Sequence, residues 1–367
     1  MNNNSKTQFN KVLVIGLGQL GLPVANYVKE KGFNDVYGHD ISPKAIDRAE
    51  KTAGIKKATN FSDFDVYIVC VSTHKPGDIS SPYIEGLLSV IERISKEAKR
   101  NGALVSIEST IPRGTSNKVL EILGHKLHVA HVPHRWYALE EKEHGVNQLR
   151  VVGGAYDCCL EAAIQFYNGN SSGIVSSSSS SSSTDNIIAD GNNNNNNNGK
   201  NNMNANNNND NNPVIRRSLG IPMHPVSKIE IAELTKIIEN AHRYLQIAFA
   251  EDLYLYCQAN NINFAELRDS LNTKWNVNIL EPREGIGGHC LPKDTLMFLQ
   301  SSKYIRSKTL TAAVQVDQDY RRFRQVRVSK SVLSPSLSLS PSSFVEDSTP
   351  TELQLECPLT DDNTNKM

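Results

Sequence analysis

The segment EGIGGHCLPKD, residues 284–294, contains a cysteine in a chemically unusual setting. Cys290 follows two glycines and a histidine and precedes a proline, a lysine and an aspartate. A thiol can act as a nucleophile or as a metal ligand once it has lost its proton. The cysteines of the chain show no metal-ligand spacing, and the close pair, Cys158 and Cys159, is adjacent, which suits neither a zinc site nor a disulfide framework. We therefore expect reduced thiols and no metal site.

A second stretch with chemical potential lies near the N-terminus. In KVLVIGLGQLGLPVANYVKEKG, residues 11–32, an apolar run leads into three glycines in G-x-G-x-x-G spacing and then into a helical pattern. Gly16 permits the tight turn, Gly18 lets the backbone approach a pyrophosphate, and Gly21 lets the helix pack against the strand. The helix N-terminus then faces the phosphates. This context predicts a dinucleotide site rather than an ordinary glycine-rich turn.

The acid that ends the next apolar run indicates which dinucleotide binds. DVYGHD ends in Asp40, about twenty residues beyond the glycines, where a carboxylate can accept both ribose hydroxyls of NAD. The same charge would repel the 2′-phosphate of NADP. The sequence therefore predicts NAD as the cofactor. We include the turn residues Gln19 and Leu20 in its site.

Two further apolar runs end in hydroxyl residues. DVYIVCVST ends in Thr73, and the run GALVSIEST ends in Thr110. Open α/β sheets place their ligands at the carboxyl ends of strands, so both threonines are candidates for the site, Thr73 beside the cofactor. Ser and Thr also end strands for purely local hydrogen-bonding reasons, and the pattern alone does not separate the two interpretations.

These elements predict an α/β fold: an N-terminal Rossmann-type doubly wound sheet followed by a long-helix dimerisation domain. The sheet domain covers residues 1–170, with the runs KLHVAHVPHRW and QLRVVGGAY extending the sheet. The helical domain covers 214–325 and begins with more than thirty residues without Gly or Pro. There Lys236 and Asn240 stand four apart, hence on one helix face, unless they are merely solvated surface residues.

Composition restricts the remaining possibilities. Lys and Arg number 39 and Asp and Glu also number 39, so the chain lacks the positive field of a dedicated nucleic-acid or membrane-surface binder. The N-terminus is polar, and the sequence has no apolar run long enough to span a bilayer, which favours a cytoplasmic protein. Residues 171–213, rich in Ser and Asn, and residues 326–367, rich in Ser and Pro, are predicted to be disordered.

At this point the motifs resemble the UDP-glucose/GDP-mannose dehydrogenase family, which includes UDP-N-acetylmannosamine dehydrogenases. The matching segments are GLGQLGLPVA, ESTIPRGT, AELTKIIENAHRYLQIAFAEDL and GIGGHCLPKD, in the order of the family and with roughly its spacing. They span most of residues 11–318. The resemblance implies NAD-dependent oxidation of the C6 alcohol of a nucleotide sugar to a carboxylate, by a homodimer.

The resemblance also implies roles for individual residues. Cys290 matches the nucleophile that traps the aldehyde as a thiohemiacetal, later a thioester. Lys236 and Asn240 match the pair that stabilises the oxyanion. Asp294 matches a carboxylate for proton transfer, and Thr110 matches a hydroxyl that holds the hydrolytic water.

Four residues are assigned to the substrate. Gly287 and Gly288 let the backbone approach a sugar closely. His134 and Arg135 occupy the place where the family usually has Glu-Arg after a proline, so a carboxylate is replaced by a histidine, which can act as a base near neutral pH.

Two other departures from the family pattern keep alternatives open. The V-P-T-P loop of the family is here V-S-T-H, and the family's second nucleotide-binding domain has no counterpart in the roughly fifty residues that follow the long helices. A non-catalytic or weakly active NAD-binding homodimer is therefore the alternative to an active enzyme. A β-hydroxyacid or 6-phosphogluconate type dehydrogenase is less favoured because that class uses no cysteine nucleophile.

Overall fold

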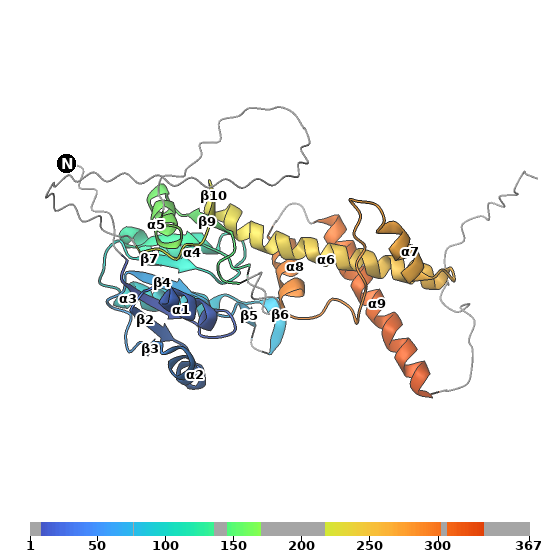
Figure 1. Cartoon of the computed structure of the whole chain (residues 1–367), viewed down its shortest axis with the longest axis horizontal. Helices are drawn as coiled ribbons and strands as arrows, with labels where there is room; N and C mark the ends of the chain where they lie inside the picture. Colours follow the sequence, from blue (N-terminus) through green and yellow to red (C-terminus); the bar gives the residue numbers. More distant parts are fainter. Residues whose placement is uncertain (1–8, 76, 136–144, 170–216, 302–306, 334–367) are drawn as a thin grey trace, which may run out of the picture.

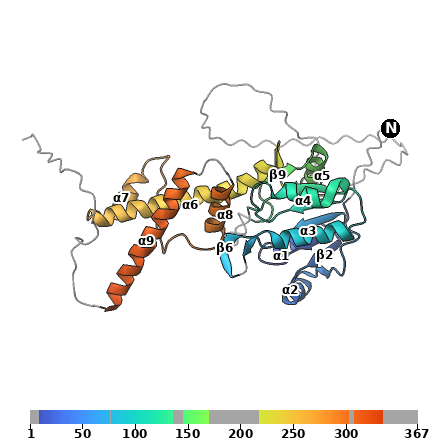
Figure 2. The same ribbon diagram turned by 180° about the vertical axis from the view of Figure 1, so that it is seen from behind.

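The computed structural model describes residues 9–75, 77–135, 145–169, 217–301 and 307–333. The N-terminal part is a sheet with helices on both faces, and the C-terminal part consists of helices around one long helix (Figure 1). The two parts lie one after the other along the longest axis of the molecule, as the view from behind also shows (Figure 2). The predicted fold class is confirmed.

The large sheet has the strand order β10-β9-β8-β7-β4-β1-β2-β3. Every neighbouring pair in it is parallel except β8 and β9, which are antiparallel. The central strands are short apolar runs buried on both faces, as expected when helices cover both sides of a parallel sheet. The strands are β1 Lys11–Ile15, β2 Asp35–His39, β3 Lys56–Lys57, β4 Val66–Val69, β7 Leu104–Ile107, β8 His128–His131, β9 Arg150–Gly154 and β10 Met223–Val226.

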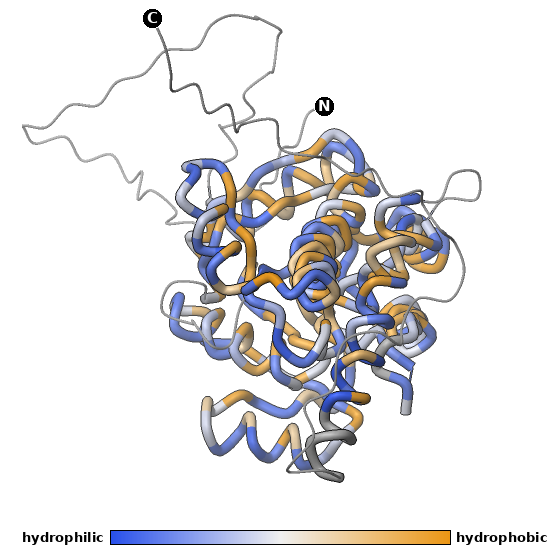
Figure 3. The backbone as a smooth tube through the Cα atoms, turned by 90° about the vertical axis from the view of Figure 1, so that its right-hand side faces the viewer, coloured by the Kyte–Doolittle hydropathy of each residue, from blue (hydrophilic) through white to orange (hydrophobic). Residues whose placement is uncertain are grey.

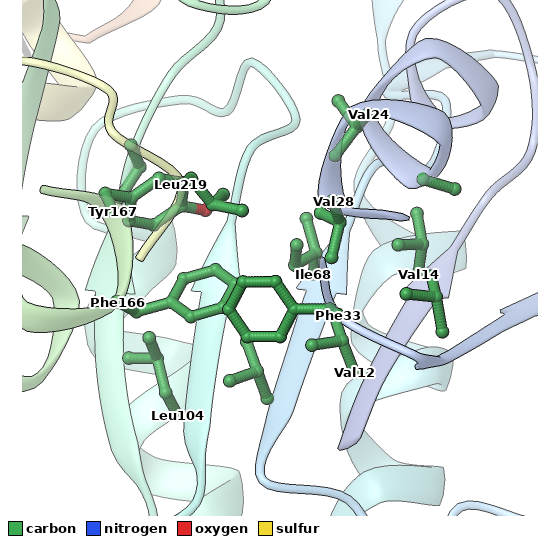
Figure 4. Packing of buried hydrophobic residues seen from close by; sticks show 14 of the residues in the cluster. Val12, Val14, Val24, Val28, Phe33, Ile68, Leu104, Phe166, Tyr167 and Leu219 are labelled. Atoms are coloured by element: carbon green, nitrogen blue, oxygen red, sulfur yellow. The ribbon is translucent and has the colours of Figure 1, made fainter. Parts of the chain in front are cut away.

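Helices pack on both faces of this sheet. On one face α1 (Gly21–Glu30), α2 (Pro43–Ala53) and α5 (Asp157–Tyr167) share a core with the strands. Figure 4 shows part of this core, where the rings of Phe33 and Phe166 meet with centroids 5.6 Å apart. On the other face α3 (Glu85–Glu97) and α4 (Thr115–Leu123) bury apolar residues spaced one turn apart, and η1 (Gly124–Lys126) leads into β8. The sheet is therefore doubly wound, as predicted.

The C-terminal part is organised by α6 (Ile229–Ala259), a helix of 31 residues. It packs against α8 (Cys290–Gln300) and α9 (Lys308–Leu333), and α7 (Phe264–Leu271) follows its C-terminal end. A small core of Tyr244, Ala248, Ile286 and Ala313 joins α6 to α9 and the loop before α8. Seen along the long axis, hydrophilic and hydrophobic stretches alternate along these helices, which is the pattern of helices with one buried face (Figure 3).

Two features differ from expectation or go beyond it. A small antiparallel ribbon, β5 (His74–Lys75) with β6 (Asp78–Pro82), follows the end of β4 and contacts α8. The prediction that the chain is disordered from residue 326 is wrong for residues 326–333, because α9 continues to Leu333. The predicted insert, 171–213, lies outside the described residues, as does the chain beyond 333.

No helix in the described part of the chain combines the length and the apolar character needed to cross a bilayer.

Candidate active site

The glycine turn has the geometry that its spacing predicts. Gly16 lies between β1 and α1 with φ of +90°, and a Cβ there would lie 2.6 Å from the carbonyl oxygen of Cys70. A Cβ on Gly21 would lie 1.7 Å from the Gly16 carbonyl oxygen. At Gly18 a Cβ would meet nothing within 4 Å, so the backbone there faces open space. The first and third glycines are required by packing, while the second leaves room beside the turn.

Asp40 lies directly beside this turn. Its Oδ2 accepts a hydrogen bond of 2.7 Å from the Leu17 backbone N–H, and its Oδ1 accepts one of 2.7 Å from the Ser42 backbone N–H. Arg48 donates to the Leu17 carbonyl oxygen at 2.9 Å. The carboxylate is thereby fixed at the end of β2, and each oxygen keeps lone-pair capacity for a further donor. Gln19, which is exposed, and Leu20 complete the approach to α1.

The ends of β4 and β7 come together as predicted. The buried Thr73 donates from Oγ1 to the Thr110 carbonyl oxygen at 2.7 Å. From the other part of the molecule, Lys293 Nζ lies 3.4 Å from Thr73 Oγ1. The strand ends of the sheet therefore meet the first turns of α8. Lys293 was not predicted as a site residue from the sequence, although it directly precedes Asp294 in the motif that contains Cys290.

A polar cluster surrounds Cys290, the first residue of α8. Asn240 on α6 donates from Nδ2 to Asp294 Oδ2 at 2.5 Å, and Lys293 Nζ lies 2.8 Å from Asp294 Oδ1. Both Lys293 and Asp294 are buried, so the pair is shielded from water. The positive charge of Lys236, one turn before Asn240, acts on the Cys290 thiol. The structure thus brings the pair Lys236 and Asn240 to the pair Cys290 and Asp294, and the sequence places the two pairs at least fifty residues apart.

The protonation of Cys290 is set by opposing effects. Desolvation and then the Asp294 carboxylate raise the pKa of the Cys290 thiol, and Lys293 and Lys236 lower it by less. The net effect is a raised pKa of the Cys290 thiol. The positive charges of Lys293 and Lys236 by themselves would favour the thiolate. The thiol is therefore protonated at neutral pH, and a proton acceptor is needed before it can attack.

Cys290 also has an aromatic neighbour from its own loop. His289 Nε2 lies 3.4 Å from Cys290 Sγ, and the ring of His289 lies 5.6 Å from the ring of His74 on β5. His74 is the last residue of the V-S-T-H segment, and Ser72 Oγ lies 2.8 Å from its Nδ1. The family has a proline at the position of His74, so this difference from the family pattern places an imidazole beside the loop that carries Cys290. Neither histidine was selected from the sequence as a site residue.

The two glycines of this loop are open to solvent. Gly287 and Gly288 are exposed, and a Cβ built on either meets nothing within 4 Å. Gly288 has φ of +75°, a conformation that strains other residues. The arrangement leaves space for a ligand to approach the backbone before Cys290.

Comparison with known proteins identifies the family of this chain. The NAD binding domain of the UDP-glucose/GDP-mannose dehydrogenase family matches residues 48–170, and the central domain of that family matches residues 230–319. Together the two matches cover more than half of the 367 residues. The chain belongs to the UDP-glucose/GDP-mannose dehydrogenase family. Its cofactor is accordingly NAD, and its family is one of oxidoreductases that act on CH–OH groups.

Relatives with curated names support this assignment. A UDP-N-acetyl-D-mannosamine dehydrogenase of Campylobacter jejuni is 26% identical over 377 aligned positions, covering 93% of this chain and 80% of the relative. The enzyme of that name from Pyrococcus horikoshii is 27% identical and covers 80% of this chain. The chain spans 65% of the length of that relative.

Solved structures show the same fold. The UDP-N-acetylmannosamine dehydrogenase structure from P. horikoshii superposes with a TM-score of 0.64 at 23% identity, covering 88% of this chain and 72% of that one. A 3-hydroxyisobutyrate dehydrogenase from Mycobacterium tuberculosis superposes with a TM-score of 0.56 at 14% identity, covering 86% of this chain and 94% of that one. The second likeness shows that a dinucleotide domain followed by long helices is shared beyond the family.

His134, the residue that departs from the family pattern, lies in a buried charged cluster. Its Nε2 lies 2.7 Å from Glu108 Oε2, and Arg150 Nη1 lies 3.1 Å from the same oxygen. Tyr167 donates to Glu108 Oε1 at 2.5 Å. Desolvation and then Arg150 lower the pKa of His134 to about 4. The suggestion that His134 acts as a base near neutral pH is therefore not supported, because burial keeps the imidazole neutral and weakly basic.

Arg135 is also engaged within the protein. Its guanidinium pairs with Glu239 on α6 and donates to the Leu149 carbonyl oxygen at 3.1 Å. In this arrangement Arg135 ties the end of β8 to the long helix. A substrate contact for Arg135 requires this pair to open.

Proposed function

We propose that this chain oxidises the C6 alcohol of a nucleotide sugar to a carboxylate, with NAD as hydride acceptor and Cys290 as covalent nucleophile. The observation that carries the proposal is the buried pair Lys293 and Asp294 in the first turn of α8, with Asn240 of α6 bonded to Asp294 and Lys293 beside Thr73 of the cofactor domain. Burying charges costs free energy even when they are paired, and charged groups with this cost gather at functional sites. A non-catalytic scaffold has no use for a thiol placed against them.

The first part of the reaction makes the sugar aldehyde. NAD, when bound at the glycine turn, accepts the hydride that leaves the alcohol carbon. The alcohol proton needs an acceptor within the site, and Asp294 provides a carboxylate whose Oδ2 is held by Asn240 at 2.5 Å. The ammonium groups of Lys236 and Lys293 stabilise negative charge on the substrate oxygen.

The second part converts the aldehyde to the acid. The Cys290 sulfur forms a bond to the aldehyde carbon, its proton passes to a base, and the carbonyl electron pair moves onto oxygen. Transfer of a second hydride, for which a second NAD would be the acceptor, turns this thiohemiacetal into a thioester. Water held near Thr110 then attacks the thioester carbon, the C–S bond breaks, and the thiol regains a proton. Because the pKa of Cys290 is raised, the proton acceptor for the thiol is a requirement of this scheme.

The names of the relatives indicate which substrate to test first. In a panel of candidate substrates, UDP-N-acetyl-D-mannosamine is tested first because several relatives are named as dehydrogenases of that sugar. UDP-glucose and GDP-mannose come next because the family is named after them. We expect two NADH per carboxylate from the substrate that is accepted. The chain covers only part of the length of several relatives, so the panel includes sugars without the nucleotide.

The test compares wild type with Cys290→Ser. The variant should bind NAD with wild-type affinity in calorimetry, because the glycine turn belongs to the other part of the molecule. It should lose net formation of the acid. If it still produces two NADH per carboxylate at the wild-type rate, the thiol is structural and the mechanism is wrong. If no substrate of the panel reduces NAD while NAD itself binds, the alternative of a non-catalytic NAD-binding protein replaces the proposal.

A further inference from the structure

A cluster of metal-binding side chains lies away from the candidate active site. His128, Cys158 and Cys159 each offer one ligand atom, and these atoms all lie within 4.8 Å of one another. His128 begins β8, and the two cysteines lie in the first turn of α5. Strand β8 runs parallel to β7, so its first residue lies at the amino-terminal end of these strands, whereas Thr110 follows the carboxyl-terminal end of β7. The cluster is therefore separate from Cys290 and from the strand ends used by the cofactor.

The fold explains why the sequence did not reveal this group. The cysteines are adjacent and exclude a conventional metal motif, and His128 is thirty residues before them. Strands β8 and β9 pair antiparallel, with Ala130 opposite Gly154, so the chain leaving β9 returns to the start of β8. Helix α5 begins there and brings both thiols to His128. The expectation that the chain holds no metal site rested on spacing alone.

The cluster of His128, Cys158 and Cys159 lies in a hollow that a metal ion can reach from solvent, and its sulfur and nitrogen ligands suit a borderline-soft cation. The three side chains line a surface hollow of ≈ 960 Å³, together with Asp157, His125 and Tyr156 among others. Cys159 is buried, His128 is half-buried and Cys158 is exposed. Thiolates at the first turn of a helix are stabilised by its positive end.

We propose that His128, Cys158 and Cys159 bind one Zn²⁺ ion, with the fourth coordination position open to the hollow. Two sulfurs and one imidazole match the ligand preference of zinc, and a set of three protein ligands with an open position is a known form of zinc site. With Zn–S of about 2.3 Å and Zn–N of about 2.1 Å, tetrahedral ligand atoms lie roughly 3.6–3.8 Å apart. The atoms must therefore approach by about an ångström, which rotation of the exposed Cys158 side chain permits. Each thiol releases its proton on coordination.

The test is zinc titration of the full chain after reduction of its thiols and removal of metal by a chelator. We expect one Zn²⁺ per chain in calorimetry, with proton release into the buffer from both thiols. Substitution of cobalt for zinc should give thiolate charge-transfer absorption and the visible bands of tetrahedral Co²⁺. Cys158→Ser and His128→Gln should each weaken zinc binding by at least about 100-fold, because loss of a ligand exceeds the effect of losing an outer-shell partner.

Cys290→Ser is the matched control, since it removes an exposed thiol that also lies at the start of a helix. It should retain wild-type zinc affinity. The proposal is overturned if wild type binds no zinc stoichiometrically, if binding survives Cys158→Ser, or if binding is lost in Cys290→Ser instead. His128→Gln alters a half-buried strand residue, so if it does not fold, the exposed Cys158→Ser variant and the cobalt spectrum decide the matter.

Discussion

Acid sensitivity of the folded state follows from His131, the last residue of β8. The side chain is fully buried, and its Nδ1 lies 2.9 Å from the Ile107 carbonyl oxygen. Its Nε2 has no hydrogen-bond partner in the described part of the chain. Desolvation lowers the pKa of His131 from 6.5 to about 4. The folded protein therefore holds this imidazole neutral at a pH where the unfolded chain has already taken up a proton.

The sign and the size of the effect follow from this pKa difference. Above pH 6.5 the imidazole is neutral in both states, and the stability of the fold is complete. As pH falls from 6.5 to about 4, the unfolded state binds the proton and the folded state does not, so the free energy of unfolding decreases. At about 1.36 kcal/mol per pKa unit, His131 alone removes roughly 3 kcal/mol by pH 4. His134 has a lowered pKa as well and acts in the same direction.

The assay is urea unfolding followed by circular dichroism at pH values from 7 to 4, for wild type and His131→Asn. The asparagine amide keeps a donor for the Ile107 carbonyl oxygen and does not titrate. At pH 7 the variant should lose about 1–2 kcal/mol because a smaller side chain leaves a cavity. Its loss of stability toward pH 4 should be smaller than that of wild type by roughly 3 kcal/mol.

His224→Asn is the matched control, since it removes an exposed histidine of β10 rather than a buried one. Equal slopes for wild type and His131→Asn between pH 6.5 and 4 would refute the reasoning. That result would mean that the folded protein accepts the proton on His131 without penalty.

Four further predictions address the site and the assembly. Alkylation of Cys290 at pH 7.5 should become faster in Asp294→Asn, because the carboxylate raises the pKa of the thiol, and slower in Lys236→Met; a reversed order in iodoacetamide kinetics contradicts the assigned charges. Asp40→Ala should weaken NAD binding more than NADP binding in calorimetry; tighter NADP binding by wild type would remove Asp40 from the ribose. Deletion of residues 171–213 should lower the melting temperature by less than about ten degrees, and a larger drop would show that the segment packs. The chain should form a homodimer through α6, whose exposed Ile231 and Ile238 line a surface hollow of ≈ 570 Å³; light scattering that shows a monomer at micromolar concentration contradicts this.

Local features of the site could be predicted from the sequence because short-range geometry determines them. A glycine turn between a strand and a helix needs Gly16 and Gly21 for steric reasons that involve only neighbouring backbone and one adjacent strand. Asp40 follows from the length of one strand–helix–strand unit. Lys236 and Asn240 share a helix face because four residues make about one turn. The position of Cys290 at the start of α8 agrees with its Gly-rich approach.

Contacts between distant segments were decided by the tertiary structure alone. The enclosure of His134 depends on Glu108 and Arg150, which reach it from neighbouring strands of the sheet. The helix α9 runs past the predicted boundary and continues to Leu333.

The sequence by itself determined the dinucleotide turn, the order of the sheet and the long helices, and Lys236, Asn240 and Asp294 as partners of Cys290. It could not determine that Asn240 bonds Asp294, that Lys293 reaches Thr73, or that His128 lies beside Cys158 and Cys159. Those contacts join residues that are 30 to 220 positions apart, and their existence depends on strand order and helix packing. Spacing in a sequence reports which side chains share one element, whereas a site built between elements is fixed by how those elements pack.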